Sequence, residues 1–147
     1  MRSYEYRYRV GLEDTNIIGN VYFSHYVRWQ GRCREMFLHE HVPQLAGELG
    51  RGLTLATTRV SCSYYLELSA FDDVVIRMSA GSMTRSRLTM RFSYFRVLRS
   101  GEELLVAEGE QEVACVQRIG ASVASIPLPE PLKDAFQRYV DSSTIAV

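Results

Sequence analysis

The polar segment from Glu13 to Asn20 contains the residues best suited to chemistry. It reads EDTNIIGN and supplies two carboxylates, two carboxamides and one glycine. A carboxylate can take a proton from water or attack a carbonyl carbon, whereas the neutral amide of Asn16 can only form hydrogen bonds. Asn16 could polarise a carbonyl group and hold the negative charge that develops on its oxygen. The alternative is an asparagine whose side chain folds onto a turn.

Arg34 is the second candidate, in the segment YVRWQGRCREMF. Helical periodicity places it at the margin of an apolar face, away from the exposed arc that holds Arg28 and Arg32. Its guanidinium could bind a carbonyl oxygen or a carboxylate. The alternative is a buried ion pair with Asp14 or with Glu35 of a neighbouring chain. Glu35 lies on the polar arc and is kept only as a possible partner of an arginine.

A helix of four or five turns is expected to position these side chains. Apolar residues recur at helical steps of three and four: Tyr22, Tyr26, Trp29, Cys33, Met36 and Phe37. A second apolar sector, formed by Phe23, Val27 and Leu38, predicts that the helix is covered from more than one side. Gly31 costs about 1 kcal/mol relative to alanine in mid-helix, which predicts close approach of another backbone.

Strands are expected before and after this helix in the sequence. Residues 4–12 alternate polar and apolar side chains, and strand-like runs follow at about 53–68, 74–84, 87–98 and 103–117. The short connections between these runs predict antiparallel neighbours. Glu108, Glu110 and Glu112 share one strand face, which predicts pairing with arginines of neighbouring strands. Prolines then introduce a short helix from Leu132 to Tyr139, and 141–147 is expected to be a flexible tail.

The whole-chain composition sets the broad class. The chain has 147 residues, with 17 basic and 17 acidic side chains, so nothing draws it toward nucleic acid. Cys33, Cys62 and Cys115 lack metal-binding spacing, which favours free thiols in a reducing cytoplasm over a metal site. No run of about 18 apolar residues occurs, so we expect a cytoplasmic protein with no membrane span.

The helix and its preceding loop also carry a family resemblance. EDTNIIGNVYFSHYVRWQGRCREMF resembles the corresponding segment of hotdog-fold thioesterases of the 4-hydroxybenzoyl-CoA type. Within that family, EDTNIIGNVYF together with RWQGRCREMFL is most similar to the thioesterases of enediyne polyketide biosynthesis. The resemblance extends through LELSAFDD to ASIPLPEPLKDAF. It implies an α+β fold: a single hotdog domain over 1–140, with a long antiparallel curved sheet wrapped around one central helix.

The same resemblance implies roles for individual residues. Asn16 stands where the 4-hydroxybenzoyl-CoA branch has its catalytic acid, and in the enediyne branch an asparagine is expected there, acting with an arginine that maps to Arg34. Phe23 matches the residue whose backbone N–H completes the oxyanion hole. Asp14 and Glu35 are possible supports. Residues implied in substrate binding are Gly19, Asn20, Tyr26, Thr58 and Arg59, although core packing is an alternative for Tyr26 and turn formation for Gly19.

The resemblance further implies an activity. A β-ketoacyl polyene thioester would be hydrolysed from an acyl carrier protein or an iterative synthase carrier domain, with decarboxylation to a methyl ketone polyene. The implied partners are that carrier and further copies of the chain, as a homodimer and probable dimer of dimers. No cofactor is implied beyond the carrier's phosphopantetheine. Arginines that could border the entrance are Arg85, Arg87, Arg91, Arg96 and Arg99.

Two alternatives stay open. A general acyl-CoA thioesterase could use Asp14 or another acid as its base. A non-catalytic acyl-binding hotdog protein could have lost activity along with the acid. A dehydratase is disfavoured, since the sequence shows no histidine and acid pair at the required junction.

Overall fold

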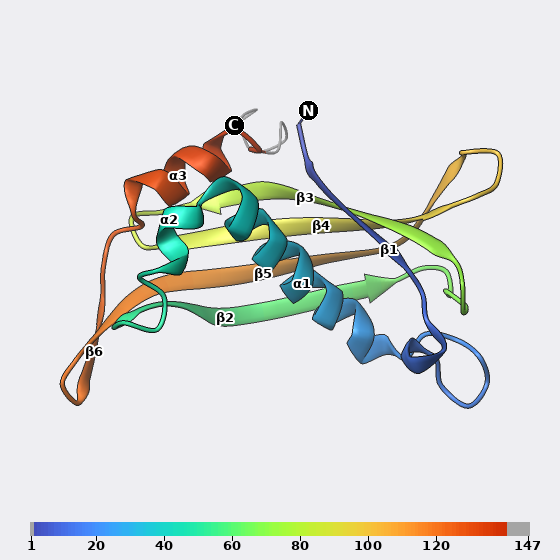
Figure 1. The fold of residues 1–147 in the computed structure, drawn as a ribbon, viewed down its shortest axis with the longest axis horizontal. Helices are drawn as coiled ribbons and strands as arrows, with labels where there is room; N and C mark the ends of the chain where they lie inside the picture. The colour runs from blue at the N-terminus through green and yellow to red at the C-terminus, as the bar shows by residue number, and fades with distance from the viewer. Residues whose placement is uncertain (1, 141–147) are drawn as a thin grey trace.

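A curled antiparallel sheet packs against a long helix (Figure 1). The computed structural model describes residues 2–140, so the expected tail over 141–147 lies outside the described residues. The elements are β1 (Tyr4–Arg9), η1 (Leu12–Asp14), α1 (Phe23–His41), α2 (Pro43–Ala46), β2 (Leu53–Tyr64), β3 (Asp73–Met83), β4 (Arg87–Val97), β5 (Glu103–Ile119), β6 (Ser122–Ser125) and α3 (Glu130–Gln137). The predicted α+β hotdog architecture is confirmed.

The strand order is β1-β3-β4-β5-β2, with β6 paired to β5. The predicted antiparallel pairing is confirmed for β3 with β4 and for β4 with β5. It is wrong for β2 and β3, which lie on opposite sides of the β4–β5 pair. Their connection instead crosses the end of the sheet. Two hydrogen bonds hold it there: the Val21 N–H donates to the Leu68 carbonyl (2.8 Å), and the Phe71 N–H donates to the Val10 carbonyl (2.7 Å).

Helix α1 lies across one face of the sheet and supplies much of the core. Its Trp29, Cys33 and Phe37 are buried there. The predicted inward face of β4 is confirmed, because Leu88, Met90, Phe92 and Tyr94 are all buried, whereas Thr89 of the predicted outward face is also buried. This packing fixes the direction of α1, and its N-terminus therefore lies at the end of the sheet where the β2–β3 connection crosses (Figure 1).

The second apolar sector of α1 is incompletely covered. Phe23 is 58% exposed, and Val27 and Leu38 are half-buried. Gly31 also differs from expectation, because a Cβ at this position would meet nothing within 4 Å among the described residues. In the described part of this single chain, α1 is therefore not fully covered on a second side, and no other backbone approaches Gly31 closely.

The outer face of the sheet carries a ladder of paired charges. Arg87 Nη1 lies 2.8 Å from Glu112 Oε1, and both Arg59 and Arg91 contact Glu110. The predicted pairing of these glutamates with strand arginines is confirmed for Glu110 and Glu112. Glu108 instead accepts a hydrogen bond from the Tyr65 hydroxyl.

The arginines suggested for the entrance do not form one patch. Arg87 and Arg91 belong to the charge ladder. Arg85 precedes β4 and Arg99 follows it, so these two are separated by more than the length of the strand, about 33 Å. Arg96 has its Nε atom buried without a hydrogen bond in the described structure.

Candidate active site

The loop between η1 and α1 folds as a small antiparallel ladder. The Tyr22 N–H donates to the Asp14 carbonyl (3.1 Å), and the Asn16 N–H donates to the Asn20 carbonyl (2.7 Å). Gly19 closes the turn, with its N–H bonded to the Asn16 carbonyl at 3.0 Å. Its φ of +92° lies in the left-handed region that glycine adopts without strain. Asn16 and the start of α1 are thereby brought together.

The Asn16 side chain has one occupied end and one free end. Its Oδ1 accepts the Ile18 N–H (3.0 Å) and the Asn20 N–H (3.2 Å), the turn arrangement considered as the alternative to a catalytic role. Within residues 2–140, its Nδ2 group donates to no protein acceptor. The turn therefore uses the acceptor and leaves both N–H donors available, so the two interpretations of Asn16 are compatible.

A cavity of about 440 Å³ opens beside this loop. Asn16, Asn20, Phe23 and Tyr26 line it together with apolar and aromatic side chains of β2 and the segment after it, and the Glu67 carboxylate of that segment also lines it. The first backbone N–H groups of a helix have no intrahelical acceptor, and no acceptor for the Phe23 N–H is present in the described part of the chain. The cavity thus combines an apolar wall with unused donors at one end.

Tyr26 has one face in the core and one edge at the cavity. It is 3% exposed, and burial is the main cause that raises its pKa to about 12. Its ring meets the Tyr64 ring edge-on at a centroid distance of 4.9 Å, and the Tyr64 hydroxyl donates to the Phe23 carbonyl (2.9 Å). Core packing of Tyr26 and a substrate contact are therefore also compatible.

The Arg34 side chain reaches from α1 to strands β2 and β5. Its Nη1 donates to Thr57 Oγ1 (2.9 Å) and to Gln111 Oε1 (3.2 Å). No carboxylate of the described residues lies within ion-pair distance, and burial lowers the pKa of Arg34, with the charge of Glu35 opposing that shift. A partly buried guanidinium without a counter-ion is suited to binding an anion or a developing negative charge.

Asn16 and Arg34 do not meet within one chain. Phe23, which shares the cavity of Asn16, lies eleven residues before Arg34 on α1, a separation of about 16 Å along the helix axis. The corner expected from the sequence therefore contains Asn16 and Phe23 together, and Arg34 belongs to a second location on the same helix.

Thr58 and Arg59 point away from the side of β2 that faces α1. Thr58 Oγ1 donates to Glu112 Oε1 (2.6 Å), and Arg59 Nη1 lies 3.3 Å from Glu110 Oε2, both on the outer sheet face. Thr57 shares the inward face of Leu53 and Leu55 and reaches Arg34, and a bulge between Thr57 and Arg59 turns both Thr58 and Arg59 outward. Substrate contact by Thr58 and Arg59 stays a prediction.

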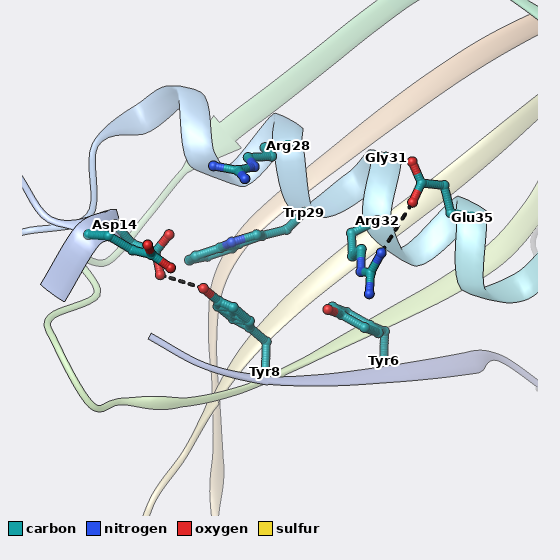
Figure 2. Close-up of a pocket in the computed structure, with 9 residues that line it drawn as sticks. Tyr6, Tyr8, Asp14, Arg28, Trp29, Gly31, Arg32 and Glu35 are labelled. Carbon is teal, nitrogen blue, oxygen red and sulfur yellow. Dashed lines mark hydrogen bonds and ion pairs between the residues drawn. The ribbon is translucent and has the colours of Figure 1, made fainter. Parts of the chain in front are cut away.

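The two acids considered as supports line the same pocket but differ in exposure and in partners. Glu35 is exposed and lies 3.4 Å from Arg32 on the outer side of α1. Asp14 is 2% exposed and lines this pocket of about 350 Å³ between β1 and α1, where its carboxylate accepts the Tyr8 hydroxyl (Figure 2). Neither carboxylate is among the residues that line the cavity beside Asn16.

Three contributors were missed or only touched on from the sequence. Gln111 is buried and accepts from Arg34, and Tyr64 closes the cavity against Phe23. Alternation in EGEQEVA does place Gln111 on the face opposite to the three glutamates, which signals a polar side chain turned inward. Alternation from Leu53 and Leu55 likewise places Thr57 on the inward face of β2.

A scan against protein-family models matches residues 10–136 to the thioesterase-like superfamily. The chain therefore belongs to this family of hotdog-fold thioester hydrolases. Among solved structures, the dynemicin thioesterase, studied for its binding of polyene, is 41% identical, with a TM-score of 0.91 over 95% of this chain and 99% of the other. The predicted resemblance, including its enediyne branch, is confirmed. A search of the curated proteins finds no match.

More distant structures share the fold. The 4-hydroxybenzoyl-CoA thioesterase of Pseudomonas sp. strain CBS-3 is 20% identical, with a TM-score of 0.76 over 92% of this chain and 99% of the other. A 1,4-dihydroxy-2-naphthoyl-CoA thioesterase from Synechocystis is 17% identical, with a TM-score of 0.78 over 92% and 96%.

Two further features bear on the expectations from sequence. Residues 2–140 contain no group of three or more histidine, cysteine, aspartate or glutamate side chains arranged to hold a metal ion. None of the helices in the described range is long and apolar enough to cross a membrane.

Proposed function

We propose that this protein hydrolyses a β-ketoacyl polyene thioester, delivered by an acyl carrier protein or the carrier domain of an iterative polyketide synthase in enediyne biosynthesis. The observation that carries the proposal is the cavity beside Asn16, where unused N–H donors face an apolar wall. The 41% identity to a thioesterase studied for polyene binding supports the substrate class.

In the proposed reaction, water attacks the thioester carbonyl carbon and the carbonyl oxygen becomes an oxyanion. Asn16 Nδ2 and the Phe23 N–H donate hydrogen bonds to that oxygen. When the intermediate collapses, the C–S bond breaks and the carrier thiol receives a proton through solvent. Glu67 lines the same cavity, but the proposed reaction assigns no side chain as general base. Because such a base is typically worth about 100- to 10,000-fold, turnover is slow.

Arg34 completes the site across a dimer. Strand β2 ends the sheet, so one of its edges is unpaired within the described residues, and apolar side chains beside it are exposed. Antiparallel pairing of two such edges, centred between Val60 and Ser61, sets Thr57 of one β2 opposite Tyr64 of the other. Since Arg34 contacts Thr57 and Tyr64 lines the cavity, Arg34 of the partner subunit then approaches Asn16.

The product supports a second role for Arg34. Hydrolysis yields a β-keto acid, which loses carbon dioxide to leave a methyl ketone. A guanidinium without its own carboxylate partner is free to hold the product carboxylate before that step. The carrier supplies the phosphopantetheine, so the enzyme needs no cofactor of its own.

Thiol release and product mass test this proposal. With a β-ketoacyl polyene on its carrier, we expect catalytic thiol release and a methyl ketone product. A general acyl-CoA thioesterase would instead prefer short acyl-CoA substrates. A non-catalytic binder would retain one acyl chain per site and release no thiol.

A further inference from the structure

We propose that Asp14 is a positioning residue of this site: its buried carboxylate fixes the loop that presents Asn16 and takes no proton from water. This inference rests on the proposed thioester hydrolysis, because it assigns Asp14 a part in that reaction. It also explains why an acid two residues before Asn16 does not replace the missing catalytic acid.

The Asp14 carboxylate accepts hydrogen bonds from two parts of the chain and lies close to a third. Its Oδ2 accepts the Tyr8 O–H from β1 (2.6 Å) and the Gly11 N–H from the loop entry (2.9 Å). Its Oδ1 lies 3.5 Å from His25 Nδ1 in the first turn of α1, at ion-pair distance but without hydrogen-bond geometry. Burial, followed by the bond to Asp14, raises the pKa of Tyr8 to about 12, so Tyr8 stays a donor.

The backbone of Asp14 continues this connection into the catalytic loop. Its carbonyl accepts the Tyr22 N–H (3.1 Å), which forms the base of the ladder that closes at Gly19. One step further, the Asn16 N–H and Oδ1 are both bonded to Asn20. A shift of Asp14 therefore moves the whole ladder relative to α1. Misplacement of a reacting group by 1 Å can cost about 100-fold in rate.

The surroundings of Asp14 argue against proton transfer. The carboxylate is 2% exposed and faces the pocket between β1 and α1, beside Trp29 and Tyr8 (Figure 2). Asn16 lines the other cavity. A general base must lie within hydrogen-bond reach of the attacking water, directly or through one further water. Asp14 is turned away from the place where that water would attack.

A double-mutant cycle between Asp14 and Asn16 distinguishes a positioning role of Asp14 from a general-base role. If Asp14 acts through Asn16, Asp14→Asn lowers kcat roughly 10-fold with KM little changed, since an amide oxygen can still accept one of the donors. In an Asn16→Ala background, Asp14→Asn then lowers kcat by less than about 2-fold. A general base predicts losses of about 100- to 10,000-fold in both backgrounds, which would overturn the inference.

Amide hydrogen exchange adds a readout that needs no substrate. We expect faster exchange of the Ile18 and Asn20 N–H groups in Asp14→Asn and, more mildly, in Tyr8→Phe. Glu13→Gln is the matched control, because Glu13 is an exposed neighbour in the same turn and should leave exchange and kcat unchanged. Wild-type exchange at both amides in Asp14→Asn and Tyr8→Phe would contradict the inference. If wild-type protein releases no thiol, the proposed function fails while the exchange result still stands or falls separately.

Discussion

The outer sheet face and the corner at the start of α1 use similar polar side chains in opposite ways. On the outer face, arginines and glutamates of neighbouring strands satisfy one another. At the corner, Asn16 keeps two free donors. Further along α1, where Arg34 contacts β2 and β5, this arginine has only neutral acceptors. The paired polar groups of the outer face belong to the architecture of this protein, and under the proposed function the unmatched donors of Asn16 and Arg34 carry its chemistry.

Loss of the Arg34 guanidinium is the largest effect that this contrast predicts beyond the loss of Asn16 itself. Arg34→Ala should lower kcat on the order of 100-fold, because a charged donor to the oxyanion is lost. Arg34→Lys should recover only part of the rate, since an ammonium group does not reproduce the planar fork of donors. Steady-state thiol release measures both variants. A wild-type kcat in Arg34→Ala would show that the unpaired Arg34 takes no part in the reaction and would contradict the contrast with the outer face.

Mixed dimers test whether the two unmatched groups meet across subunits. When Asn16→Ala and Arg34→Ala proteins are unfolded together and refolded, half of the dimers are mixed and each mixed dimer holds one intact site. About a quarter of wild-type activity should therefore return. Refolding each variant alone is the control. No recovery in dimers shown to be mixed would place both residues in the same subunit's site.

Alkaline stability tests the buried wall of the cavity. Tyr26 has its pKa raised from 10 to about 12, mainly by burial. Between these values the native state keeps a proton that the unfolded state has lost, so stability falls as pH rises from 10 to 12. Denaturant midpoints across this range should decrease less steeply in Tyr26→Phe. An unchanged slope in that variant would show that Tyr26 does not carry the effect.

The smallest effect is expected on the outer face. Arg87→Ala removes a partly exposed ion pair with Glu112, and such pairs contribute little. The melting temperature should fall slightly and kcat should stay at the wild-type value. A loss of activity comparable to that of Arg34→Ala would show that satisfied arginines also take part in the reaction, and the contrast between the two regions would lose its meaning.

The sequence predicted much of the fold because periodicity reports burial directly. The long helix, the alternating strand β4 and the glutamate face of β5 all follow from side-chain spacing. The order of β2 in the sheet did not follow, because a connection between strands can cross the sheet end when other loops supply its hydrogen bonds. Val21 and Phe71 supply them here.

The candidate site was only partly predictable for the same kind of reason. Residue chemistry identified Asn16 and Arg34, and a helix start near Phe23 was visible in the sequence. The distance between the Asn16 cavity and Arg34 depends on the length of α1 between Phe23 and Arg34, and the outward direction of Arg59 depends on a bulge. The burial of Asp14 required knowledge of which strand and helix enclose it.

The central claim is that this site works by donating hydrogen bonds to the thioester oxygen. Single-turnover thiol release from a β-ketoacyl carrier substrate, compared between wild type and Asn16→Ala, tests it most directly. Loss of one oxyanion donor should slow the chemical step about 100- to 1000-fold, with substrate binding little changed. Release at the wild-type rate in Asn16→Ala would contradict the account.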